Sequence, residues 1–286
     1  MKDCLYMKKY RIDKTKNIGN IIFVVEGGRP DTGGTELRLL KKIFTDILGY
    51  EVQELRRGSE EFIAHGPNSN SRVFALNLPK NQLTQLTEES IDKLFCRLKE
   101  EFNIKPENCP IFYLYDRDVL SYKRNELRKK YVMKYTDPYG TKEGYQGQVL
   151  LSYPAIESYL LSCIKENTVN SSFKLGKDVK PILMKEICKD DCEDKTDVHM
   201  KTIDLVFSDE TIEAEKRLVH SINEMDNGLM TLGINTYDLD NLAPTLLAVY
   251  DSQQEKYDKE DTFSLLSLVG MALLELGVII ECDETE

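Results

Sequence analysis

Three short apolar runs constrain the fold of this chain more than any other feature. They lie at residues 20–26 (NIIFVVE), 110–115 (PIFYLY) and 148–152 (QVLLS). A strand that is apolar on both faces has to be covered on both faces, as in a parallel sheet. Segments with helical periodicity lie between the runs, and this alternation is typical of α/β domains. The sequence therefore predicts an α/β fold built on a parallel sheet.

The segments around these runs predict the remaining elements. Thr35 is predicted to cap a helix and Thr87 to begin another, each ahead of leucine, isoleucine and phenylalanine residues at helical spacing. Residues 51–55 and 72–78 are typical of strands with a turn-rich stretch between them, and Pro154 opens a helix after the third run. Beyond about residue 165 the periodicity is helical, over 178–189, 208–226, 237–256 and 261–277, around an exposed loop at 190–200. We expect an α/β domain over residues 1–165 and a mainly helical accessory domain over 166–286.

Composition excludes several classes of protein. No run of about 18 apolar residues is long enough to span a membrane, and the charged N-terminus lacks the apolar core of a signal peptide. Seven cysteines, an odd number without an export signal, predict reduced thiols and a cytoplasmic location. Cys188, Cys192 and His199 lack a fourth ligand at a usual zinc spacing. Zinc and histidine-based catalysis are therefore not expected.

The net charge of −11 is unevenly distributed along the 286 residues. Residues 1–153 carry 26 basic and 21 acidic side chains, whereas residues 154–286 carry 12 and 28. Two differently charged solvated surfaces would explain this difference. A first half that faces a polyanionic substrate and a second half that avoids it or binds a partner would explain it as well.

Acidic residues follow the apolar runs where strands of a parallel sheet would end. Glu26 ends the first run, Asp116 and Asp118 follow the second, and Glu157 lies one turn into the helix after the third. Glu36 opens the helix after the first run. Converging carboxylates repel each other unless a cation binds them, and Mg²⁺ or Mn²⁺ prefers oxygen ligands. Two such ions can stabilise the attacking and leaving oxygens of a phosphodiester.

Each of these acids also has a purely structural explanation. Glu36 and Glu157 could be acids of the first helical turn, favoured by the helix dipole, and Asp118 could be a helix cap. Glu26 and the Asp116–Asp118 pair are harder to explain in this way, since they follow strands expected to be buried.

The order of these motifs resembles the TOPRIM domain of topoisomerases, primases and OLD-family nucleases. VVEG, then Thr35-Glu36 opening a helix, then YDRD and YPAIESYLL are similar to TOPRIM proteins of bacterial anti-phage systems, both the RloB type and the TOPRIM effector of the PARIS system. The resemblance covers residues 20–165. It implies a TOPRIM-like domain with Glu26, Asp116 and Asp118 as catalytic residues.

The resemblance also implies a metal centre that holds Mg²⁺ or Mn²⁺, two ions in all. Its ligands would be Glu26, Glu36, Asp116, Asp118 and Glu157. The family places its second acid four residues after the first, whereas the GRPDTGG loop widens that gap here. We favour Glu36 as the second acid, with Asp31 as the alternative.

The densest basic segment of the chain follows the aspartate pair. It predicts a nucleic-acid-binding surface formed by Arg117, Lys123, Arg124, Arg128, Lys129 and Lys130. Tyrosines at 122, 131 and 135 interleave with these cations, and cations with rings suit a phosphate backbone with stackable bases. A solvated helix face is the alternative explanation.

By resemblance, we expect a metal-dependent endonuclease that cleaves RNA, tRNA included, or DNA, and acts as a toxic effector in anti-phage defence. A separate ATPase subunit is the expected partner, since the chain has no ATP-binding motif, and a homodimer is a further expectation. A degenerate, non-catalytic TOPRIM-like subunit of such a complex is the alternative. Phosphoryl or nucleotidyl transfer, as in primases, is a third interpretation.

Overall fold

The computed structural model describes most of the chain. The residues described are 9–25, 34–55, 60–68, 70–77, 87–117, 124–140, 146–188, 202–204, 206–207 and 211–282.

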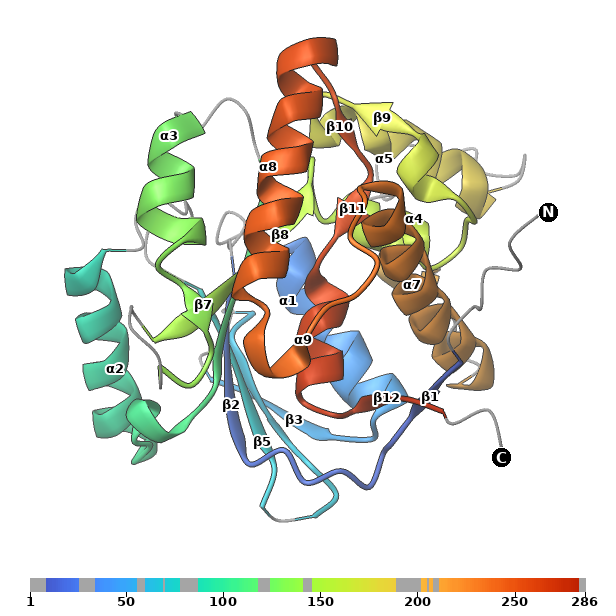
Figure 1. Cartoon of the computed structure of the whole chain (residues 1–286). Coiled ribbons are helices and arrows are strands. Elements are labelled where there is room, and N and C mark those ends of the chain that lie inside the picture. The colour runs from blue at the N-terminus through green and yellow to red at the C-terminus, as the bar shows by residue number, and fades with distance from the viewer. Residues whose placement is uncertain are drawn as a thin grey trace.

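A mostly parallel sheet forms the centre of the α/β fold (Figure 1). Its strand order is β11-β8-β6-β2-β5-β4-β3, and β7 pairs with β8 at one side. The four parallel strands are β8 (Gly147–Tyr153), β6 (Ile111–Asp116), β2 (Asn20–Val25) and β5 (Arg72–Asn77). The antiparallel strands are β3 (Glu51–Glu54), β4 (Phe62–His65), β7 (Thr136–Asp137) and β11 (Leu266–Ser267). The three apolar runs of the sequence are thus neighbouring strands.

Helices connect the strands and extend into the second half of the chain (Figure 1). In the first half they are α1 (Thr35–Lys42) with its π-helical extension η1 (Ile43–Ile47), α2 (Glu88–Phe102), and α3 (Arg124–Leu127) with its extension η4 (Arg128–Val132). Later helices are α4 (Glu157–Ser162), α5 (Gly176–Cys188), α7 (Thr211–Thr231), α8 (Ala243–Glu260) and α9 (Val269–Glu275). Short 3-10 turns lie at η3 (Pro106–Asn108), η5 (Thr168–Asn170) and η6 (Leu239–Asn241). α2 begins where the sequence predicted it, and the structure shows that Thr87 caps it within a capping box with Ser90.

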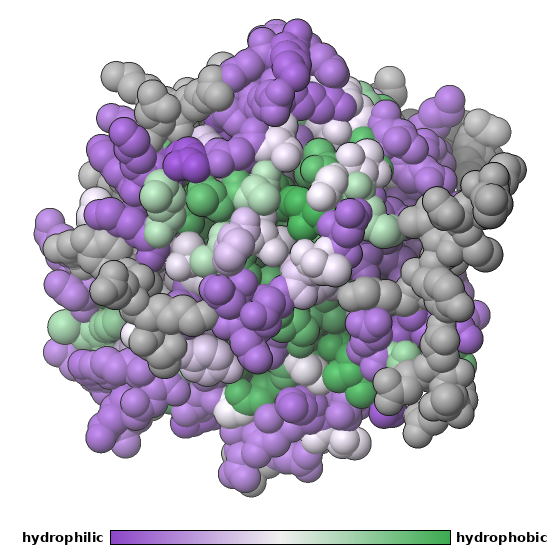
Figure 2. Space-filling view, in the orientation of Figure 1, coloured by the Kyte–Doolittle hydropathy of each residue, from purple (hydrophilic) through white to green (hydrophobic). Residues whose placement is uncertain are grey.

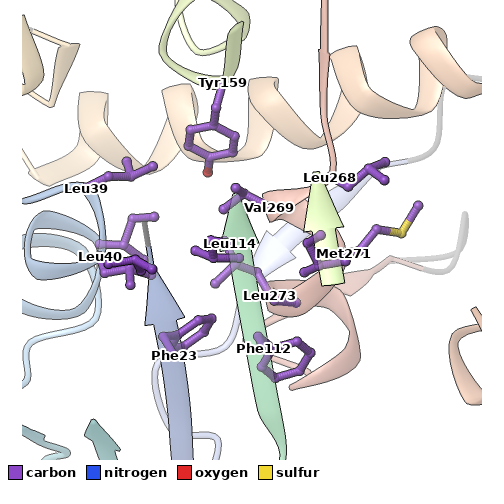
Figure 3. Packing of buried hydrophobic residues seen from close by; sticks show 14 of the residues in the cluster. Phe23, Leu39, Leu40, Phe112, Leu114, Tyr159, Leu268, Val269, Met271 and Leu273 are labelled. Atoms are coloured by element: carbon purple, nitrogen blue, oxygen red, sulfur yellow. The ribbon is translucent and has the colours of Figure 1, made fainter. Parts of the chain in front are cut away.

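The hydrophobic core joins residues from both halves of the chain (Figure 3). Phe23 of β2 stacks on Phe112 of β6 with ring centroids 5.4 Å apart. Leu114 of β6 belongs to the same buried cluster as Val269 and Leu273 of α9. A fully buried side chain of this size contributes about 1.5–3 kcal/mol to stability. Burial of this apolar surface is therefore the main force that holds the C-terminal segment on the sheet.

Gly147, the first residue of β8, has a backbone conformation that its neighbours require. Its φ is +116°, a value that L side chains rarely adopt. A β-carbon at this position would meet the ring of Tyr113, which is fully buried on β6. Glycine therefore lets β8 start close against β6.

Several sequence predictions are confirmed, and others are wrong in detail. The strands over the three runs are present, and helices begin at Thr35 and after Thr87. The prediction that Thr35 caps its helix is wrong, because Gly34 is the N-cap residue and no side chain caps the helix start. The sequence missed β4, which ends at the first residue of the predicted turn-rich segment HGPNSNS. A helix over 261–277 was also the wrong prediction, because Asp261 ends α8 in a left-handed conformation. The chain then forms β10 (Phe263–Ser264) and β11 before α9 begins at Val269.

Strands after residue 165 pair with one another and with strands before it. β11 pairs with β8 in the central sheet, and β12 (Ile279–Glu281) pairs with β1 (Tyr10–Ile12). β9 (Ser172–Phe173) pairs with β10. Strands of two or three residues are too short to produce a period in the sequence. The division of the chain at residue 165 remains a prediction.

The surface seen in Figure 2 is mainly hydrophilic around its rim, and hydrophobic residues are visible toward its middle, in the region of β10, β11 and α9. Within the described part of the chain, no helix is both long enough and apolar enough to cross a membrane.

Candidate functional site

The four parallel strands end at one edge of the sheet. β2 ends at Val25, β6 at Asp116 and β8 at Tyr153, and the pairing of Asp116 with Ser152 keeps the last two ends in register. Sites of open parallel sheets form at this carboxyl edge. We therefore expect the predicted acids to lie at this edge.

Asp116 lies at the carboxyl end of β6 and binds the start of α4. Its side chain is half-buried, and Oδ1 accepts a 2.7 Å hydrogen bond from the backbone N–H of Ile156. Ile156 is the N-cap residue of α4. The exposed N–H groups and the dipole of a helix start favour a carboxylate at this place. The sheet and helix together therefore fix the direction in which Asp116 points.

Glu157, the first residue of α4, is buried and forms an ion pair with α5. Its Oε1 lies 3.2 Å from Nζ of Lys180, whose side chain is 41% exposed. Gly176 at the start of α5 permits this contact, since a β-carbon there would lie 2.5 Å from Cβ of Ala155. Glu157 thus lies next to the residue whose N–H binds Asp116, with a cation beside it.

Of the other predicted ligands, one lies within the described residues. Glu36 lies in the first turn of α1 and is only 6% exposed. Glu26, Asp31 and Asp118 lie outside the described residues. The structure therefore describes three of the five favoured ligands, and they come from β6 and from the first turns of α1 and α4.

The described residues supply part of the ligand set that a divalent metal needs. Asp116 and Glu157 supply the carboxylate oxygens that Mg²⁺ and Mn²⁺ prefer. Across the described ranges, however, no three His, Cys, Asp or Glu side chains gather closely enough to hold a metal ion. The chemistry of the two carboxylates fits such an ion, and any complete ligand set needs residues such as Glu26 or Asp118.

Arg117 is not a surface cation, and this corrects the prediction that it binds nucleic acid. Its side chain is 2% exposed, and Nη2 donates a 3.0 Å hydrogen bond to Oε1 of Gln254 on α8. The guanidinium also lies over two rings, 5.4 Å from the centroid of Phe263 and 5.9 Å from that of Tyr250. A phosphate backbone cannot reach the guanidinium in this position.

The rest of the basic segment divides into paired and exposed cations. Arg128 binds both carboxylate oxygens of Asp251 on α8, at 2.7 and 2.8 Å. Lys129 and Lys130 are exposed, and Lys130 lies 3.7 Å from Glu126. Lys123 and the side chain of Arg124 lie outside the described residues. Two of the six predicted nucleic-acid contacts are therefore exposed lysines in the structure.

The tyrosines of this segment do not form a surface for stacking bases. Tyr131 and Tyr135 are buried and stack on each other with centroids 6.4 Å apart, and Tyr135 also contacts Tyr113 of β6. These two tyrosines therefore pack the chain at η4 against the sheet. Tyr122 lies outside the described residues.

Tyr153 ends β8 close to Arg117, but it is not suited to proton transfer. Burial raises the pKa of its phenol well above the ordinary value, although the Arg117 guanidinium opposes this rise. The phenol therefore keeps its proton at neutral pH and does not serve as a general base.

Two residues of this region had no signal in the sequence that tied them to it. Lys180 belongs to a loose group of lysines in an expected helix, and nothing local pairs it with Glu157. Gln254 lies 137 positions after Arg117. Only the packing of α5 and α8 brings these side chains to the site.

Comparison with known proteins identifies no relative of this chain. No protein-family model, no curated protein and no solved structure matches it.

Proposed function

We propose that this protein is a metal-dependent nuclease of TOPRIM type, with its centre at the carboxyl edge of β2, β6 and β8. The observation that carries this proposal is the position of Asp116 at the end of a buried parallel strand, next to the helix start that bears Glu157. Buried or half-buried carboxylates at a sheet edge are costly without a cation, and a divalent ion would offset their repulsion.

The proposed roles follow from the chemistry of each group. Asp116, Asp118 and Glu26 would hold one or two Mg²⁺ or Mn²⁺ ions, and Glu36 and Glu157 would complete the ligand set. The ions supply charge stabilisation for the attacking and leaving oxygens of a phosphodiester. Lys129 and Lys130, both exposed, would contact the backbone of RNA or DNA.

The sequence resemblance supports a further part of the proposal, the biological setting. A toxic effector of anti-phage defence that is controlled by a separate ATPase subunit fits a nuclease without an ATP motif of its own. A tRNA is the substrate that we favour within this proposal.

A cleavage assay tests the proposed reaction. Total tRNA, single-stranded DNA and duplex DNA are incubated with the protein in Mn²⁺ or in EDTA. We expect Mn²⁺-dependent cleavage by the wild type and its loss in Glu26→Gln and Asp116→Asn. Glu51→Gln, which changes an exposed carboxylate on the outer strand β3, is the matched control and should cleave normally. Equal cleavage by all four proteins would refute the assigned centre.

A non-catalytic binding subunit is the second candidate, and one observation favours it. Asp116 and Glu157 both have protein partners, the N–H of Ile156 and the ammonium of Lys180. Carboxylates that are satisfied in this way do not require a metal. Absence of Mn²⁺ binding in calorimetry, together with normal folding, would favour this candidate over the nuclease.

A further inference from the structure

Helix α8 binds two arginines of the chain that follows β6, one directly after the strand and one in η4. Arg117, which directly follows β6, binds Gln254 of α8. Arg128, at the start of η4, binds Asp251 one turn earlier on the same helix. Both arginines, one directly after β6 and one in η4, therefore bind the same helix from the second half of the chain.

The environment of Arg117 is unusual for an arginine. The side chain is 2% exposed, and its neighbours include the rings of Tyr250 and Phe263. A buried guanidinium loses its hydration, and an apolar side chain of similar length would avoid that cost. A buried arginine in such a place calls for an explanation beyond stability.

Gln254 is itself held in one orientation. It is 4% exposed, and its Nε2 donates a 3.1 Å hydrogen bond to Oδ1 of Asp258, one turn further along α8. This bond aims Oε1 of Gln254 at Nη2 of Arg117, 3.0 Å away. The guanidinium therefore meets an oriented acceptor.

The backbone transmits the position of Arg117 to Asp116. The N–H of Arg117 donates a 2.8 Å hydrogen bond to the carbonyl of Ser152, which extends the pairing of β6 with β8. Successive residues of an extended chain point to opposite faces, so Arg117 reaches α8 while Asp116 reaches the N–H of Ile156. Holding the arginine on one face fixes the carboxylate on the other.

We infer that Arg117 and Gln254 are positioning residues, through which α8 fixes the Asp116 carboxylate at the start of α4. The second half of the chain thereby sets the geometry of the candidate centre. The link to metal binding rests on the proposed function, whereas the link to the position of Asp116 does not.

Hydrogen exchange of the Ile156 amide tests the positioning without any metal. We expect faster exchange in the peptide over residues 154–160 for Gln254→Leu, because Asp116 no longer holds that amide firmly. Gln253→Leu is the matched control: Gln253 is equally buried on α8, but it binds Ser264 instead of Arg117.

Calorimetry with Mn²⁺ alone then tests the consequence for the centre. Loss of a residue that orients a ligand weakens metal binding about tenfold or more. We expect that weakening in Gln254→Leu and in Arg117→Lys, which keeps the charge but loses the planar fork. Gln253→Leu should bind Mn²⁺ within about twofold of the wild type, well short of that weakening.

The outcomes separate the two proposals. If Gln254→Leu and Gln253→Leu exchange alike at residues 154–160, the positioning role is overturned whatever the metal does. If the exchange differs as expected and the wild type binds no Mn²⁺, the positioning role stands and the nuclease proposal fails. Tenfold weaker binding together with faster exchange supports both.

Discussion

Asp116 is expected to have two separable roles, one in stability and one in metal binding. Asp116→Ala removes the acceptor of the 2.7 Å hydrogen bond from the N–H of Ile156. Loss of a side chain that satisfies a helix start costs about 0.5–2 kcal/mol, and the half-buried position places the expected loss at about 1–2 kcal/mol. Asp116→Asn keeps an acceptor and loses only the charge, which is worth about 0.3–1 kcal/mol at a helix start.

With Mn²⁺ present, Asp116→Asn should no longer be close to the wild type in its free energy of unfolding. A ligand at ten times its Kd stabilises the folded state by about 1.4 kcal/mol. Mn²⁺ should therefore stabilise the wild type and neither variant, because an amide oxygen is a poor replacement for a carboxylate ligand.

Urea unfolding followed by far-ultraviolet circular dichroism measures both effects, and this method suits a chain without tryptophan. Without metal, the free energy of unfolding is expected to decrease from the wild type to Asp116→Asn and further to Asp116→Ala. An Asn variant as unstable as Ala would refute the role of the hydrogen bond. A wild type that gains nothing from Mn²⁺ would refute the role as a ligand.

Three further predictions concern the structure around the site. In a double-mutant cycle of Arg128→Ala and Asp251→Ala, urea unfolding should give a coupling free energy of about 0.5–1 kcal/mol. This coupling should fall in 1 M NaCl. A coupling of zero would restore Arg128 as a candidate nucleic-acid contact. Gly147→Ala should lower the free energy of unfolding by about 3 kcal/mol, since it adds backbone strain and a clash with a buried ring; a loss below about 1 kcal/mol would contradict both effects. Burial raises the pKa of Cys109 to about 11, so at pH 8 only about one thiol in a thousand is ionised there. Mass spectrometry should find that iodoacetamide labels the exposed Cys96 long before Cys109, and equal labelling would refute the burial.

The sequence by itself determined the parallel strands of the sheet and their order along the chain. β2, β6 and β8 are apolar on both faces, and only a covered parallel sheet accommodates such strands. The acids at the strand ends could be predicted for the same reason, because Asp116 is the first polar residue after an unbroken apolar run. The start of α2 next to Thr87 could be predicted from the helical period that follows it.

The sequence could not distinguish a cation in the core from one on the surface. Arg117 and Arg128 belong to the same basic segment as Lys129, yet one is buried and the next is ion-paired. Their partners, Gln254 and Asp251, come from a helix more than 120 positions away. The charge of a segment is local information, whereas burial depends on what packs against it.

The tertiary structure alone decided how the C-terminal half completes the sheet. β11 has two residues and β12 has three, too few for any period, and their pairing with β8 and β1 depends on where α8 and α9 place them. The ion pair of Glu157 with Lys180 likewise depends on the close approach of α5 to α4 at Gly176. Periodicity records which face of an element is buried, but the partner that buries it is selected by packing across the whole chain.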